Sequence, residues 1–150
     1  MTTFATLQEL EGLVGQPLGT SDWVTVTQER IDRFAEATGD HQWIHVDPVK
    51  AKAGPFGTTI AHGFLTLSLL PVLGEQAYAV ADTRMGVNYG CNKVRFTAPV
   101  PSGSRVRGVF RLLSYTAIEG GAQLSVEATV EIEGSSKPAC VAESLVRRYV

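Results

Sequence analysis

The residues from His62 to Ala79 are apolar on nearly every side of the helix that they would form. A helix of that kind is a buried one, because none of its faces is suited to water. Pro71 lies inside the segment and predicts a kink, or the end of its first section, since proline removes a backbone hydrogen bond. The chain is therefore expected to fold around one buried helix.

The residues after this segment have the two-residue periodicity of β-strands. Apolar and polar side chains alternate, which predicts a sheet with one face in water. The alternation changes phase near Asn92, and this change indicates a β-bulge. Strands are predicted over residues 87–96, 105–118, 124–133 and 140–149.

One buried helix followed by long antiparallel strands predicts an α+β fold. We expect a single domain over residues 1–150, in which a curved antiparallel β-sheet wraps around a long apolar central helix. A sheet of this kind leaves edge strands open, and open edges favour pairing with a second copy of the chain.

The segment before the central helix combines one clear helix with a long connection. Residues 28–38 have apolar side chains at helical spacing, with Thr27 as the N-cap and Gly39 as the left-handed residue that ends the helix. Residues 40–57 show no clear periodicity and are interpreted as an irregular loop with one helical turn near residues 49–53. The chain up to Gly19 has a mixed character that predicts no particular element, and a short strand follows at Trp23–Val26.

Composition narrows the classes of function. The formal net charge of −2 and the isoelectric point near 5.9 give no basic surface for nucleic acid. Cys91 and Cys140 lack metal-ligand spacing and are predicted to be small buried hydrophobic residues. With no secretory signal and no apolar run long enough to span a membrane, a cytoplasmic protein is expected.

Asp40 and His45 lie five residues apart, directly after the predicted helix end. A carboxylate and an imidazole in one short loop can share a water molecule. Hydration of a double bond beside a carbonyl needs a base that takes a proton from water and an acid that protonates the other carbon. Histidine titrates near neutral pH and suits proton transfer in both directions.

Gly63, at the start of the predicted central helix, is the candidate for holding the negative charge that develops on the carbonyl oxygen. The first amide groups of a helix have no partner within the helix, and the helix dipole favours negative charge there. A glycine also lets a substrate approach the backbone closely. The alternative is that Gly63 serves close packing only.

Three segments together resemble the (R)-specific enoyl-CoA hydratases, the MaoC-like dehydratase family of the hotdog fold. That family's loop signature is Gly-Asp-x-Asn-Pro-[Leu/Ile/Val]-His, followed six residues later by Ala or Ser. The other two segments are Ile60–Gly63, similar to the family's apolar-x-His-Gly, and residues 94–103, similar to its Arg-Phe-x-x-Pro-Val strand end. The positions that match the loop signature are Gly39, Asp40, Ile44, His45 and Ala51.

The chain departs from the signature at Gln42 and Trp43, which replace the family's Asn-Pro. This form of the loop is similar to the branch that includes nodulation-protein-N-like members. Gln42 has a longer reach than Asn, and loss of the proline frees the loop backbone. The exchange bears on which substrate is bound more than on the Asp40 and His45 pair.

The resemblance implies a hydro-lyase of fatty acid metabolism that adds water reversibly to trans-2-enoyl-CoA, giving (R)-3-hydroxyacyl-CoA, without a metal or a redox cofactor. In this scheme Asp40 and His45 activate the water and the Gly63 amide holds the thioester oxygen. A homodimer that binds an acyl-CoA thioester is implied, with no nucleic-acid partner. Acyl chain length, CoA or acyl carrier protein as carrier, direction, and the formal base remain open. The residues expected to contact the substrate are Gln42, Trp43, Ile60, His62 and Phe64.

Simpler interpretations stand beside these. Asp40 and His45 can be plain loop residues, His62 can be a packed residue at a helix start, and Trp43 can either line an acyl tunnel or pack the loop. Two rival functions are compatible with such a fold. One is a hotdog acyl-CoA thioesterase, although the residues between His62 and Gly74 include no Asp or Glu. The other is a non-catalytic acyl-CoA-binding subunit of a heteromeric dehydratase.

Overall fold

The apolar segment forms two helices that follow one another almost without a break, α4 (Gly63–Ser68) and α5 (Leu70–Ala77). The structure is a computed structural model that describes residues 1–150. Pro71 lies in the first turn of α5, where its missing N–H is not needed, so the predicted end of a first section is confirmed. Tyr78 and Ala79, predicted as helix, instead begin strand β4 (Tyr78–Val80).

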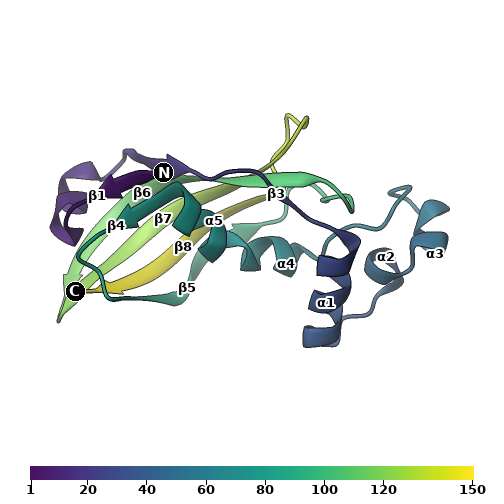
Figure 1. Ribbon diagram of the computed structural model, residues 1–150, viewed down its shortest axis with the longest axis horizontal. Coiled ribbons are helices and arrows are strands. Elements are labelled where there is room, and N and C mark those ends of the chain that lie inside the picture. The colour runs from purple at the N-terminus through teal and green to yellow at the C-terminus, as the bar shows by residue number, and fades with distance from the viewer.

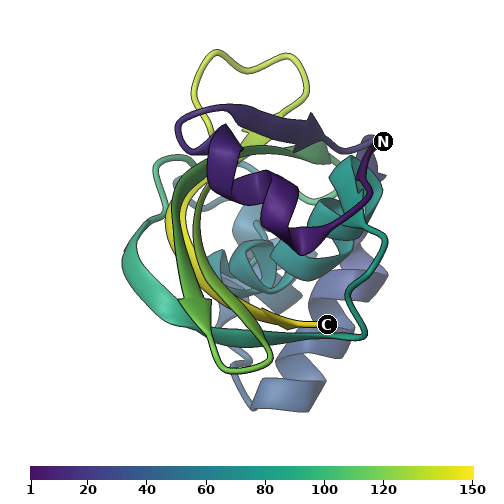
Figure 2. The same ribbon diagram turned by 90° about the vertical axis from the view of Figure 1, so that its left-hand side faces the viewer.

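The main sheet curves around these helices, as the end-on view in Figure 2 shows. In spatial order its strands are β2 (Pro17–Thr20), β6 (Arg105–Ile118), β7 (Gly121–Ile132), β8 (Cys140–Tyr149) and β5 (Met85–Arg95), and each is antiparallel to its neighbours. The short β3 (Val24–Thr25) also pairs with β6. The α+β fold with a wrapped helix, predicted from the alternation, is confirmed.

The buried core lies between the concave face of the sheet and the helices. Leu73 on α5 and Phe110 on β6 belong to it, together with Leu124 and Val126 on β7. Gly108 allows close contact at this point, because a Cβ there would lie 2.6 Å from the Phe110 ring and 3.0 Å from Leu73 Cβ. The alternation along the strands therefore creates the apolar sheet face against which the central helices pack.

The N-terminal residues form elements that no pattern indicated. Strand β1 (Thr2–Phe4) runs parallel to β4, and a 3-10 helix, η1 (Leu7–Leu13), follows it. Leu7 and Leu10 are buried in the core. Short elements of this kind carry too few residues to show a period, so they escape sequence analysis.

Three helices gather at the end of the molecule away from β1, as Figure 1 shows. Helix α1 (Gln28–Thr38) begins at Thr27, whose side chain accepts the Arg30 amide, and it ends at Gly39 with φ 79°, as predicted. Residues 40–57 contain α2 (Trp43–Val46) and α3 (Pro48–Lys52), so the helical turn predicted near residues 49–53 is confirmed, whereas α2 lies in a part predicted as irregular. Asp47 caps α3 by accepting the Lys50 amide.

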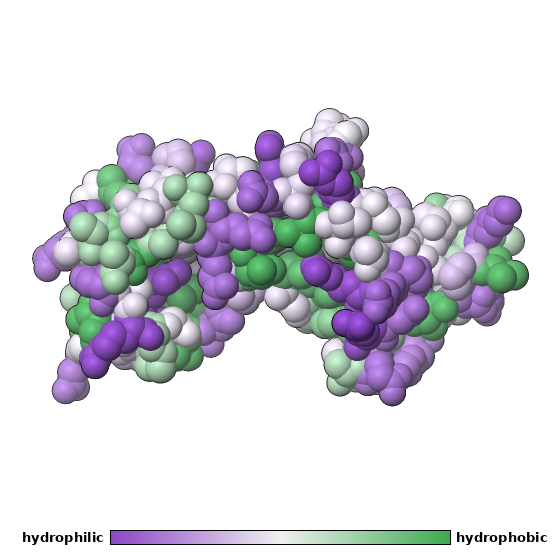
Figure 3. Space-filling view, viewed as in Figure 1, coloured by the Kyte–Doolittle hydropathy of each residue, from purple (hydrophilic) through white to green (hydrophobic).

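The central helices are not buried on every side, which corrects the sequence-based expectation. One stripe faces outward, and Phe64 on it is 66% exposed while Val72 is 40% exposed. Strand β5 is an edge strand with ten of its eleven residues exposed. Figure 3 shows hydrophobic residues gathered where the surface is hollowed at the middle of the molecule. In a monomer, this apolar stripe is exposed to water and the backbone groups of the adjacent strand edge have no strand to pair with.

The bulge predicted near Asn92 is confirmed by a register shift between Cys91 and Lys93, and a second shift lies between Asn88 and Gly90. Cys91 is exposed on β5, so the prediction that both cysteines are buried holds for Cys140 alone. Burial raises the pKa of the Cys140 thiol to about 11, with a smaller contribution from Cys91. No helix has the length and apolar character needed to cross a membrane.

Candidate active site

Asp40, His45 and His62 come together where the helices α1 and α2 meet the start of α4. One ligand-type atom from each, a carboxylate oxygen or a ring nitrogen, lies within 4.8 Å of the other two. Asp40 follows the left-handed turn at the end of α1, His45 lies on α2, and His62 directly precedes α4. The sequence linked the first two residues, whereas His62 was expected only to contact substrate or to pack.

His45 is held in a defined orientation. Its Nδ1 lies 2.7 Å from the backbone oxygen of Ile60, and the side chain is 7% exposed. A carbonyl oxygen only accepts, so Nδ1 carries the hydrogen and Nε2 keeps a free lone pair. The Ile60 amide in turn donates to the Ile44 carbonyl at 3.0 Å. Ile60, predicted to contact substrate, is thus seen to anchor the imidazole through its backbone.

A second support for α2 comes from Gln28 in the first turn of α1. Its amide nitrogen donates to the His45 carbonyl at 2.8 Å, and its amide oxygen accepts the Thr59 hydroxyl at 2.5 Å. Thr59 is buried. Sequence analysis missed this pair, because no local pattern connects two polar residues that are 31 positions apart.

Asp40 is exposed, and its loop is tied to the protein at two points. Its Oδ1 accepts the backbone amide of Gln42 at 3.3 Å. Its backbone oxygen lies 2.9 Å from His62 Nε2, which therefore donates. The Gln42 side chain is exposed and makes no hydrogen bond, so the structure shows no contact from it to the cluster.

His62 is 3% exposed and stacks on His45, with ring centroids 3.9 Å apart and planes inclined by 24°. Because Nε2 donates to Asp40, Nδ1 is left as an acceptor, and it is buried without a partner. Such a group costs about 1–3 kcal/mol.

Gly63 is the first residue of α4, as predicted, and its amide makes no hydrogen bond to another protein group. A Cβ at this position would lie 2.6 Å from the Phe96 ring, closer than real contacts allow. Packing against Phe96 therefore requires a glycine, and the free amide lies at the same residue. The two interpretations of Gly63 are compatible.

Trp43 and Phe64 lie beside the cluster rather than in it. The Trp43 ring packs against Gly54, where a Cβ would be 2.9 Å from it, and Lys50 Nζ lies 4.7 Å from its centroid. These contacts favour the loop-packing interpretation of Trp43. Phe64 meets the Phe96 ring edge-on, with centroids 5.6 Å apart.

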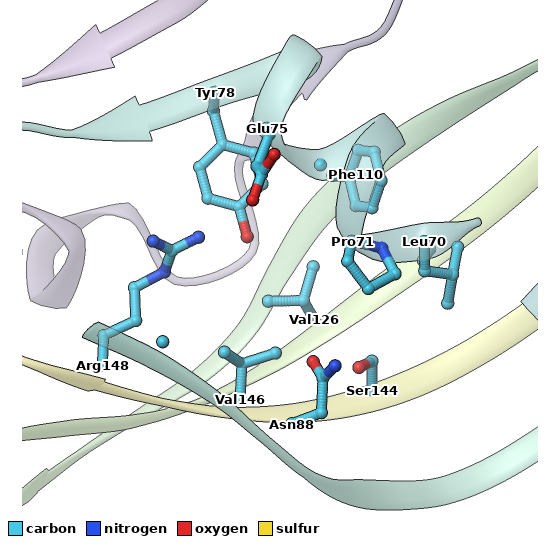
Figure 4. Close-up of a pocket in the computed structure, with 13 residues that line it drawn as sticks. Leu70, Pro71, Glu75, Tyr78, Asn88, Phe110, Val126, Ser144, Val146 and Arg148 are labelled. Carbon is cyan, nitrogen blue, oxygen red and sulfur yellow. The ribbon is translucent and has the colours of Figure 1, made fainter. Parts of the chain in front are cut away.

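Two connected cavities run along the central helices. One of about 390 Å³ has Leu67 in its lining, one helical turn past Gly63, and one of about 210 Å³ lies beside α5. Figure 4 shows the second, where Arg148, Glu75 and the Tyr78 hydroxyl lie at one side, apolar side chains such as Leu70 and Phe110 lie at the other, and two valines lie between them. The residues that line both cavities are Leu70, Pro71, Asn88 and Ser144.

Comparison with known proteins gives consistent matches. The family model described as the MaoC-like domain matches residues 9–135. The chain is 59% identical over 148 residues to 3-hydroxyacyl-thioester dehydratase Z of Mycobacterium tuberculosis, covering 98% of each chain. It is 49% identical over 140 residues to nodulation protein N of Rhizobium leguminosarum, covering 91% of this chain and 86% of that one.

Among solved structures, an unliganded R-hydratase from Pseudomonas aeruginosa superposes with a TM-score of 0.77. The superposition covers 97% of this chain and 86% of that one, at 21% sequence identity. At this identity the likeness establishes a common fold, the hotdog arrangement of a sheet around a central helix.

Proposed function

The chain belongs to the MaoC-like dehydratase family, and we propose that it adds water reversibly to trans-2-enoyl-CoA, giving (R)-3-hydroxyacyl-CoA. The observation that carries the proposal is the meeting of the Asp40 carboxylate with the His45 ring, whose free lone pair lies on Nε2. Both groups can bind one water molecule. The CoA thioester, an intracellular metabolite, makes the cytoplasm the proposed location.

The chemistry conserves atoms without a metal or a redox cofactor. Asp40 and His45 hold the water, and one of them takes a proton as the water oxygen bonds to Cβ. Electron density from the double bond moves toward the thioester oxygen, where the Gly63 amide donates a hydrogen bond. The Asp40 and His45 pair then returns one proton to Cα, which completes the product and restores the pair to its starting state. The proton is assigned to the pair rather than to one of its two residues.

The acyl chain is proposed to occupy the two cavities along the central helices. From Gly63 to Pro71 the helical rise of about 1.5 Å per residue amounts to about 12 Å. A chain whose thioester lies at Gly63 would pass Leu67 and extend toward α5. Exposed Phe64 would lie beside the thioester, and His62 and Ile60 beneath it, while Gln42 and Trp43 flank the entrance to the cluster. This arrangement favours acyl chains of medium length.

The active form is proposed to be a homodimer. Strand β5 offers an unpaired edge of eleven residues, and apolar side chains such as Met85, Val87 and Tyr89 are exposed along it. Edge strands of this length and character pair with other strands unless they are blocked. A second copy would also cover the outward stripe of α4 and α5 at Phe64 and Val72.

The experiment that tests the function is a hydration assay with purified protein and enoyl-CoA substrates of several lengths. Loss of the conjugated thioester should be accompanied by 3-hydroxyacyl-CoA of R configuration, identified by chiral chromatography. Release of free thiol without hydration would identify a thioesterase instead. Binding of acyl-CoA with neither reaction would identify a non-catalytic subunit.

A further inference from the structure

We infer that His62 is a positioning residue, which aligns Asp40 and His45 on one water molecule and does not itself exchange a proton with substrate. The inference rests on the proposed function and gives His62 a role beside Asp40, His45 and Gly63. It starts from the two contacts that the His62 ring makes at once: a hydrogen bond to Asp40 and a stack on His45.

The first contact fixes the carboxylate. Asp40 lies on an exposed loop, and its own amide reaches only Thr38 Oγ1, at 3.5 Å. The bond from His62 Nε2 to the Asp40 carbonyl is the one hydrogen bond that ties this residue to a buried side chain. Without it, the carboxylate would be carried by a loop held only through Gln42.

The second contact fixes the imidazole. The hydrogen bond to Ile60 restrains one ring nitrogen of His45, and the stack covers one ring face. Together they limit rotation of the ring, so that Nε2 keeps one direction. His62 is in turn packed by Phe34, whose ring centroid lies 4.9 Å away.

The unfavourable free energy of burying a ring nitrogen of His62 without a hydrogen-bond partner also points to a function. Donation from Nε2 leaves Nδ1 of His62 buried without a partner. Natural proteins satisfy the large majority of buried polar atoms, so each exception calls for a reason. Here the reason is that the same ring must serve Asp40 through its N–H and His45 through its face.

Three substitutions separate these contacts. His62→Phe keeps a ring for the stack and removes the donor. His62→Gln places an amide N–H near the Nε2 position, whereas His62→Asn reaches only the Nδ1 position. We expect kcat to fall about tenfold or more in His62→Phe with KM changed less than about threefold, because alignment matters most in the chemical step. The Gln variant should recover several-fold over the Asn variant.

The decisive measurement is the double variant Asp40→Asn/His62→Phe. If His62 acts through Asp40, the second change should lower kcat by no more than about threefold beyond Asp40→Asn alone. If the two substitutions lower kcat by factors that multiply in the double variant, the inference is wrong. Equal kcat in the Gln and Asn variants of His62 would also overturn it. If His62→Phe does not fold, the comparison of the Gln and Asn variants carries the test, because both lack the ring and they differ in the reach of the amide N–H.

The control is Ser125→Ala, which removes an equally buried polar side chain on β7 outside the site. Its kcat should equal that of the unmodified protein. An unmodified protein without hydratase activity would refute the proposed function, whereas a failure of the cycle in an active enzyme refutes only the role of His62.

Discussion

His45 Nδ1 lies 2.7 Å from the backbone oxygen of Ile60, so the proton position on this ring is set by a segment fifteen residues further along the chain. The contact leaves Nε2 as the atom that can take a proton. We expect His45→Gln and Asp40→Asn each to lower kcat by at least about 10²-fold, because each removes a proton-transfer group. Steady-state hydration kinetics measure the effect.

Circular dichroism and thermal unfolding should show that the Asp40→Asn variant folds like the unmodified protein, because Asp40 is exposed. Near-full activity in either variant would mean that the role given to that residue is wrong. Loss of folding in His45→Gln alone would be traced to its buried bond with Ile60.

The contact between Gly63 and Phe96 supplies a second prediction. Gly63→Ala forces its Cβ to within 2.6 Å of the Phe96 ring, so the ring must move. Overpacking of this kind typically destabilises by about 1–3 kcal/mol, which chemical denaturation can measure. Adding Phe96→Leu should restore most of the stability.

Activity in that pair of variants separates the two interpretations of Gly63. If the glycine serves packing alone, Gly63→Ala/Phe96→Leu regains activity along with stability. If substrate must approach the amide closely, kcat/KM stays at least about tenfold low in a protein of restored stability. The single variant Phe96→Leu is the matched control.

The sequence predicted the elements whose residues follow a regular hydrophobic pattern. Alternation along residues 124–133 and the apolar run after His62 were enough for the sheet and the helix, and Thr27 and Gly39 marked the ends of α1. The outward stripe at Phe64 was not predictable, because a face that another chain can cover has the same apolar composition as a core face.

The part of the candidate site that lies in one short segment was predictable from the sequence. The part that forms where three distant segments meet was not. Asp40 and His45 are near in sequence, and their residue types suit the proposed chemistry. The ring of His62 is brought to them by the end of α1 and the start of α4, and the bond from Gln28 to His45 likewise joins distant segments. Such contacts depend on tertiary packing, which local patterns do not record.

The open edge of β5 predicts the oligomeric state. Val87→Lys places a charge on an exposed strand residue, and charges on edges oppose strand pairing. We expect the unmodified protein to run as a dimer in size-exclusion chromatography with light scattering, and the variant to shift toward the monomer. Ala37→Lys, at an exposed neutral residue of α1, adds the same single charge away from β5 and should leave the mass unchanged. A monomeric unmodified protein would contradict the proposed homodimer.

Gly74 on α5 predicts how acyl chain length is selected. It lines the smaller cavity, and a Cβ there would lie 3.8 Å from the Phe110 ring, which is an ordinary contact. Gly74→Val therefore adds bulk to the cavity without a clash at its first atom. We expect kcat/KM for a ten-carbon enoyl-CoA to fall about tenfold relative to the four-carbon substrate, because the longer chain alone reaches α5. Gly74→Ala is the control and should shift this ratio less. An unchanged ratio in both variants would mean that the acyl chain does not enter this cavity.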